Sequence, residues 1–236
     1  GAEGTDIRGN VAVKPILFHT DMVRAILEGR KTVTRRVVKP QPVGQPAQMG
    51  KDSCWPGCFA SAEDERIYRP PYQPGDILWV RETWQFIPCI DCGLYVHGGC
   101  TDTPITYEDR DSVGEGCFVY RADYPEPQRV YWKPSIHMPR DAARIFLRVT
   151  DVRAERLQEI TAEGTLDEGT NVEFPEPKPS YISLAYTEMC LKPAARQSFA
   201  NLWNSTIKPA DRTIYGWDAN PWVWVIQFER AKELGP

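Results

Sequence analysis

The sequence has no long apolar run and no excess of either charge sign. No stretch approaches the roughly 18 consecutive apolar residues that a membrane-spanning helix needs, so we expect no membrane partner. No signal peptide is visible, although the opening Gly1-Ala2-Glu3-Gly4 is also compatible with removal of a leader. The net charge of −4 argues against broad, sequence-independent binding to duplex DNA, but it allows a small positive pocket for one nucleotide.

The sequence also lacks the cysteine pattern of a disulfide framework. Its seven cysteines are an odd number, unevenly spaced in a chain of 236 residues, which fits a reducing compartment. We therefore expect a cytoplasmic protein. No internal repeat is apparent, and 42% hydrophobic with 25% charged residues is ordinary for a globular domain.

Proline marks the irregular parts of the chain. The 21 prolines are nearly twice the usual share, and seven of them stand between residues 39 and 75. A second irregular stretch, 87–115, carries several glycines and three cysteines. We expect a loose N-terminal segment over 1–12, then a single domain over 13–231 with long loop insertions at about 39–75 and 87–115.

Between these stretches the hydrophobic pattern predicts short strands and a few helices. Strands are expected over residues 14–18, 32–38, 77–82, 117–120, 129–132, 144–152 and 222–229. Helices are expected from an N-cap at Thr20 to Gly29, over 157–168, and over 194–205. This content favours an α+β fold with a small closed or nearly closed sheet, a mixed β-barrel whose mouth offers a pocket.

The densest group of reactive side chains is Gly29-Arg30-Lys31-Thr32-Val33-Thr34-Arg35-Arg36. Glycine after a helix allows a positive φ, so a turn should feed the following strand. Nearby positive charge lowers the pKa of a lysine and makes Lys31 a candidate base, while the alternative is a solvated surface lysine. In a regular strand Lys31 and Thr34 point to opposite faces, so they meet only if residues 31–33 form a turn or bulge.

Four segments stand out in order: Gly29-Arg30-Lys31-Thr32, Pro74-Gly75-Asp76 with its apolar strand, Leu157-Gln158-Glu159-Ile160-Thr161 with Glu168-Gly169, and the closing strand 222–229. Together they resemble the ASCH superfamily. Segments 78–84, 136–140 and 220–223 are most similar to the longer phage and prophage members. The resemblance covers about residues 14–230, and it implies a PUA-like β-barrel with peripheral helices and two loop insertions.

The resemblance also implies an activity. One branch of the superfamily is an amidohydrolase that removes the acetyl group from N4-acetylcytidine, without a cofactor. Its catalytic residues fall on Lys31, Thr34 and Glu168. Thr34 would attack the acetyl carbonyl, Lys31 would take its proton, and Glu168 would protonate the departing nitrogen. The alternatives are a non-catalytic RNA-binding module and a ribonuclease, both of which usually need a more basic face.

Five further residues are candidate contacts for a nucleoside or RNA ligand: Arg35, Arg36, Arg81, Trp84 and His137. Arg35 and Arg36 would lower the pKa of the lysine by like-charge repulsion, or Arg36 would stabilise an oxyanion. Each of the other three has an alternative role. Arg81 suits an intramolecular ion pair, Trp84 suits core packing, and His137 suits a structural hydrogen bond.

Two close cysteine pairs fall in the irregular stretches. They are Cys54 with Cys58 and Cys89 with Cys92. Such pairs either share one tetrahedral structural zinc, which would stabilise loops that have no core of their own, or remain free thiols. His97 and Cys100 are competing ligands.

Overall fold

The computed structural model describes residues 13–50, 52–89, 105–108, 113–124, 131–170 and 192–231. The predicted loose segment 1–12 lies outside them. The chain divides into two compact units, the first built from 25–77 and 147–231, the second from 13–24 and 78–146. The prediction of one domain over 13–231 stays a prediction. None of the described helices is both long and apolar enough to cross a membrane.

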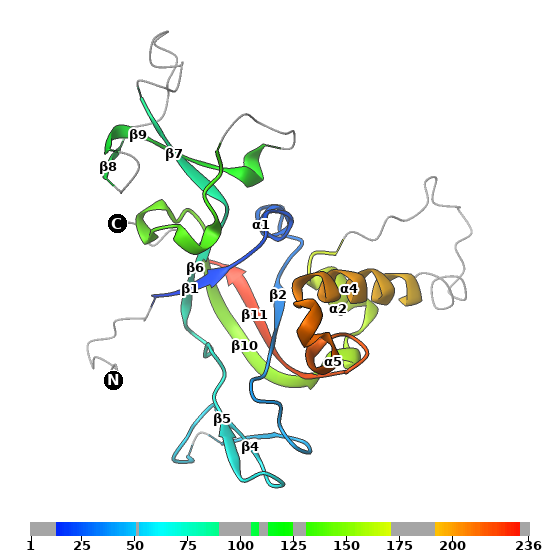
Figure 1. Ribbon diagram of the computed structural model, residues 1–236. Helices are drawn as coiled ribbons and strands as arrows, with labels where there is room; N and C mark the ends of the chain where they lie inside the picture. Colours follow the sequence, from blue (N-terminus) through cyan, green and yellow to red (C-terminus); the bar gives the residue numbers. More distant parts are fainter. Residues whose placement is uncertain are drawn as a thin grey trace. The chain divides into compact units, whose positions relative to one another are not determined.

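The first unit holds most of the helices. Its elements are β2 (Val33–Val37), β3 (Ala47–Gln48), β4 (Phe59–Ser61), β5 (Arg66–Tyr68), β10 (Phe146–Arg156), η4 (Leu157–Glu159), α2 (Ala162–Asp167), α4 (Lys192–Thr206), η6 (Pro209–Asp211), α5 (Arg212–Tyr215) and β11 (Trp222–Arg230). β11 lies between β10 and β2 and pairs antiparallel with both. Figure 1 shows these strands side by side, with α2, α4 and α5 gathered next to them.

Both faces of β11 are buried, as its aromatic and β-branched composition favours. On one face, Val223 and Val225 join a core that also holds Val33 of β2, Leu157 of η4 and side chains of α4. On the other face, Trp224 meets Phe59 of β4 edge to face, with ring centroids 5.1 Å apart. This central position fixes β2 and so positions the residues that follow Gly29.

The second unit is dominated by an antiparallel sheet. Its elements are β1 (Val13–Leu17), α1 (Thr20–Leu27), β6 (Ile77–Arg81), β7 (Trp84–Pro88), β8 (Ile105–Glu108), β9 (Val113–Tyr120), η1 (Arg121–Asp123), η2 (Ser135–His137) and η3 (Arg140–Ala142), and the boundary between units falls inside α1, β6 and β10. β9 lies between β7 and β8, as Figure 1 shows. A buried core in this unit contains Trp84, Phe86, Met138 and Ala142.

The α+β content is confirmed, with more sheet than helix. No sheet of the described residues closes into a barrel. The stretch 39–75 is not irregular throughout, because β3, β4 and β5 form a three-stranded sheet there. The expected strand 129–132 lies partly outside the described residues.

The prediction of one continuous helix over 157–168 is wrong. The chain forms the short helix η4, then an extended link, and then α2. Thr161 causes the break, since its backbone is extended and its hydroxyl accepts a hydrogen bond from Gly164 N at 3.0 Å. A threonine in that role begins a new helix rather than continuing an old one.

Candidate active site

Two helix ends meet at the candidate site. After α1, Gly29 adopts φ of 75°, and the backbone N–H groups of Arg30 and Lys31 both donate to Ala25 O. At the end of α2, Glu168 N donates to Gly164 O, so the chain turns directly after it. Lys31 and Glu168 then form an isolated antiparallel bridge between these two turns. The backbone therefore places the two side chains together.

The ammonium of Lys31 is buried and fully hydrogen-bonded. Its Nζ donates to Glu168 Oε2 at 2.6 Å, to Val33 O at 2.7 Å and to Glu168 O at 2.9 Å. The two side chains are 0% and 5% exposed, which excludes the alternative of a solvated surface lysine. Burial lowers the pKa of Lys31 below its usual range, and the charge of Glu168 offsets only part of this effect.

Arg35 holds the second oxygen of the same carboxylate. Its Nη1 lies 3.1 Å from Glu168 Oε1, and its Nη2 lies 3.5 Å from Glu155 Oε2. Within the part of the chain that the structure describes, Arg35 Nε is a buried donor without an acceptor. Glu155 also pairs with Arg153, which pairs with Asp151. A series of alternating charges therefore runs from the exposed face of β10 to the buried lysine.

The hydroxyl of Thr34 belongs to the other face of β2. The strand is regular over Val33–Val37, with Thr34 opposite Ile226 and Arg35 opposite Val225. Alternation along a strand sends neighbouring side chains to opposite faces, so Thr34 and Arg35 leave β2 in opposite directions. Thr34 is nevertheless buried, at 3% exposure.

Arg36 lies half-buried on the same face as Thr34. Burial lowers the pKa of Arg36, while its interactions with Tyr72 and Glu168 act in the opposite direction. Its positive charge in turn contributes to the lowered pKa of Lys31. The predicted influence of neighbouring arginines on the lysine is therefore present, although burial is the larger cause.

The three remaining ligand candidates belong to the second unit. The guanidinium of Arg81 donates to Ile136 O and lies over the ring of Trp79, 5.3 Å from its centroid. Trp84 is 1% exposed within the core of its unit. His137 is exposed at the end of η2. Trp84 therefore packs as a core residue in this structure, and His137 has an accessible side chain.

The four predicted zinc ligands are only partly described. Cys54 is exposed, whereas Cys58 and Cys89 are buried, and Cys92 lies outside the described residues. Over the described ranges, no group of three or more His, Cys, Asp or Glu side chains is arranged to hold a metal. The structural zinc stays a prediction.

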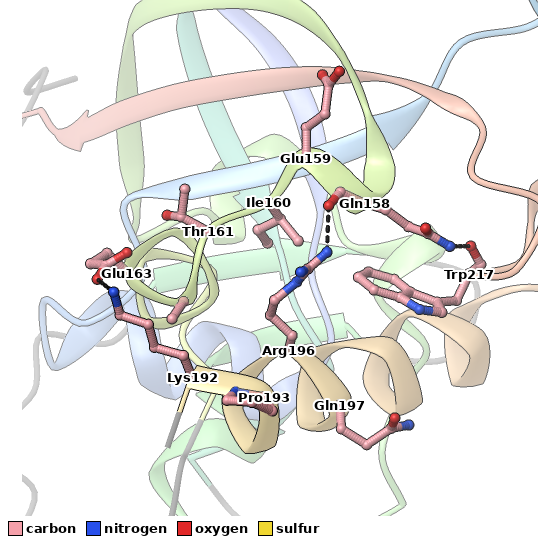
Figure 2. A pocket seen from close by; sticks show the side chains of 11 residues that line it. Gln158, Glu159, Ile160, Thr161, Glu163, Lys192, Pro193, Arg196, Gln197 and Trp217 are labelled. Atoms are coloured by element: carbon pink, nitrogen blue, oxygen red, sulfur yellow. Dashed lines mark hydrogen bonds and ion pairs between the residues drawn. The ribbon is translucent and has the colours of Figure 1, made fainter. Parts of the chain in front are cut away.

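The first unit also contains a pocket that the sequence did not reveal. It has a volume of about 720 Å³ and lies between η4, α2, α4 and the segment after α5, as Figure 2 shows. Its lining residues are Gln158, Glu159, Ile160, Thr161, Ala162, Glu163, Lys192, Pro193, Arg196, Gln197 and Trp217. The segment 157–161 was singled out by the ASCH resemblance, but its neighbours on α4 come from about 35 residues later and only folding brings them together.

No family model, no curated protein and no solved structure matches this chain.

Proposed function

We propose that the chain is an ASCH-type protein with a PUA-like fold that binds a nucleoside and hydrolyses the acetyl amide of N4-acetylcytidine or a similar substrate. The balanced reaction consumes one water and yields cytidine and acetate. The observation that supports this proposal is the convergence of Lys31 and Glu168, which are 137 residues apart and lie 2.6 Å apart through Nζ and Oε2. These are two of the three residues that the resemblance assigns to catalysis.

The lowered pKa of Lys31 suits a general base. A base works best when its pKa lies near the working pH, and burial moves this lysine in that direction from its usual value of 10.5. The proton that Lys31 takes from the nucleophile would pass across its 2.6 Å contact to Glu168, and Glu168 would deliver it to the departing amide nitrogen, which restores both groups. Arg35, held between Glu168 and Glu155, fixes the carboxylate in position.

The nucleophile is either the hydroxyl of Thr34 or a water molecule. Attack by Thr34 would give an acetyl ester that water then hydrolyses, with cytidine leaving in the first step. Because Thr34 leaves β2 on the face opposite Arg35, its assignment rests on the resemblance alone. The variant Thr34→Val keeps the shape of the side chain and removes the hydroxyl, so it separates the two routes.

The test is the release of cytidine from N4-acetylcytidine, followed by liquid chromatography. The wild-type protein is expected to release cytidine, and Glu168→Gln is expected to lose about 100-fold or more in kcat/KM. Arg30→Ala is the matched control, because Arg30 is adjacent to Lys31 but its side chain is 39% exposed and donates to Glu28 and to the backbone of Gly169 rather than to the Glu168 carboxylate. A wild-type protein that gives no more cytidine than a protein-free blank refutes the proposal.

A non-catalytic nucleoside-binding or RNA-binding module is the second candidate. The near-complete burial of Lys31 and Glu168 favours it, since side chains that are 0% and 5% exposed present almost no surface to a substrate. In that case the protein retains labelled RNA or nucleoside on a filter or in dialysis, and no acetate appears.

A further inference from the structure

We propose that the pocket between η4, α2 and α4 is the docking site for a neutral nucleoside with a planar base, and that Gly164 forms its thinnest wall towards Arg35. This inference rests on the proposed function, because the pocket would hold the substrate of the proposed reaction. The pocket residues lie outside the Lys31–Glu168 pair.

The charges that line the pocket cancel. Lys192 and Arg196 contribute two positive groups, and Glu159 and Glu163 contribute two negative groups. Lys192 Nζ lies 3.9 Å from a carboxylate oxygen of Glu163, a loose pair that Figure 2 shows at one side of the pocket. Equal numbers of acidic and basic residues in the lining favour a neutral ligand over a polyphosphate strand, whose charges would meet the carboxylate of Glu163.

Arg196 and Trp217 form a flat surface at the side of the pocket opposite the Lys192–Glu163 pair. The guanidinium of Arg196 lies 6.0 Å from the centre of the Trp217 ring, and its Nη2 donates to Gln158 O at 2.6 Å. The side chain of Gln158 donates in turn to Trp217 O at 2.8 Å. Figure 2 shows these three residues joined by their hydrogen bonds. An indole beside a guanidinium provides stacking surface for a heterocyclic base.

The size of the pocket fits this class of ligand. Its volume of about 720 Å³ falls within the roughly 300–1,000 Å³ that is usual for small-molecule sites. Lys192 and the carboxylate of Glu163 provide hydrogen-bonding groups for ribose hydroxyls at one side of the pocket. Glu159 and Gln197 point away from it in Figure 2, where Glu159 accepts from Arg156 N and Gln197 donates to Asn201.

Gly164 connects the pocket to the buried charges. A Cβ at this position would lie 3.3 Å from Ile160 Cγ1 and 3.4 Å from Thr161 Oγ1, both in pocket-lining residues. The same Cβ would lie 3.7 Å from Arg35 Nη2. Gly164 therefore lies next to both the pocket lining and the guanidinium that holds Glu168, although neither Gly164 nor Arg35 lines the pocket itself.

The first experiment is equilibrium dialysis with cytidine and N4-acetylcytidine, which needs no turnover. Arg196→Ala is expected to weaken binding about fivefold or more, because the stacking partner of Trp217 is lost. Arg212→Ala is the matched control, since Arg212 is exposed on α5 and does not line the pocket. Equal binding by wild type and Arg196→Ala overturns the inference, as does tighter binding of a short single-stranded RNA than of the nucleoside.

The second experiment concerns the wall. Gly164→Ala is expected to lower kcat/KM and nucleoside affinity, with Leu166→Ala on the exposed side of the same helix as control. Unchanged kcat/KM and nucleoside affinity in a folded Gly164→Ala protein contradict the role of this wall.

The proposed reaction and the proposed pocket can be refuted separately. Binding in the pocket without cytidine release refutes only the reaction, whereas cytidine release with an unchanged KM in Arg196→Ala refutes only the pocket.

Discussion

Lys31 is held in an environment that a lysine rarely occupies. All three hydrogen-bond donors of its ammonium have acceptors, two of which are backbone carbonyls, and its side chain is 0% exposed. Its partner Glu168 is shared with Arg35. A buried pair of this kind contributes little net stability over an apolar pair, but loss of the lysine leaves the buried carboxylate of Glu168 only partly compensated, by Arg35.

Replacing the lysine alone should therefore destabilise the fold strongly. We expect Lys31→Met to lower the free energy of unfolding by about 3–5 kcal/mol in urea denaturation. Arg30→Ala removes an exposed ion pair with Glu28 and an exposed hydrogen bond to Gly169 O, and should change the free energy of unfolding by about 1 kcal/mol or less. A loss of under about 1 kcal/mol in Lys31→Met would show that the pair is not enclosed as described.

The lowered pKa of Lys31 predicts a dependence of stability on pH. The unfolded chain keeps the proton of this lysine up to about pH 10.5, whereas the folded protein releases it at a lower pH. Between these two values unfolding takes up a proton, so a rise in pH favours the folded state. The free energy of unfolding of the wild type, measured relative to that of Lys31→Met, should thus increase as the pH rises towards 10.5. A difference that stays flat, or moves the other way, contradicts the lowered pKa.

The turns that follow α1 and α2 are the elements that assemble the site. Gly169 adopts φ of 79° directly after Glu168, and a Cβ there would lie 2.7 Å from Ala25 Cβ and 3.0 Å from Lys31 Cβ. Gly29 also has a positive φ, of 75°, but it has open space where a Cβ would point. Both positions therefore favour glycine because of their positive φ, but only at Gly169 do close neighbours also exclude a side chain.

Alanine substitutions at these glycines should differ in their cost. Gly29→Ala meets only the conformational penalty of about 1–2 kcal/mol, whereas Gly169→Ala adds a clash with α1 and with the lysine itself. We expect Gly169→Ala to be the more destabilising of the two in thermal and urea unfolding. Equal losses would mean that the turn after Glu168 does not pack against Lys31.

The elements differ in how far their sequence determines them. β11 follows from its alternating aromatic and β-branched residues, β2 from its β-branched residues, and α4 from its spaced apolar positions, so local patterns predict all three. β3, β4 and β5 are two or three residues long, too short to show a period. Thr161 is the N-cap of α2, but it stands inside a sequence pattern that looks helical throughout, so the pattern did not show that a new helix begins there.

The site residues also differ in whether a local sequence pattern predicts them. Lys31 is conspicuous in its local motif, and Glu168 was reached only through the family resemblance, since no local pattern pairs residues 137 apart. Glu155 was missed, although Asp151, Arg153 and Glu155 alternate in charge along one strand. That alternation is a signal for an ion-pair series, but its contact with Arg35 depends on the pairing of β10, β11 and β2.

The charge of the entire chain bears on which ligand it takes. A net charge of −4 disfavours polyanions but is indifferent to a neutral nucleoside. We therefore expect kcat/KM for N4-acetylcytidine to change by less than about twofold between about 50 and 300 mM salt. A steep fall with salt, measured in the same chromatographic assay, would indicate that phosphate contacts dominate and would favour an RNA substrate.

The most direct measurement is the rate of cytidine release by four proteins: wild type, Lys31→Met, Glu168→Gln and the double variant, each checked for folding by near-ultraviolet circular dichroism. Groups that act as a unit are not additive in kinetics. We predict that each single variant loses about 100-fold or more and that the double variant loses little beyond the more impaired single one. Wild-type protein that releases no cytidine, or folded single variants that keep the wild-type rate, would contradict the account.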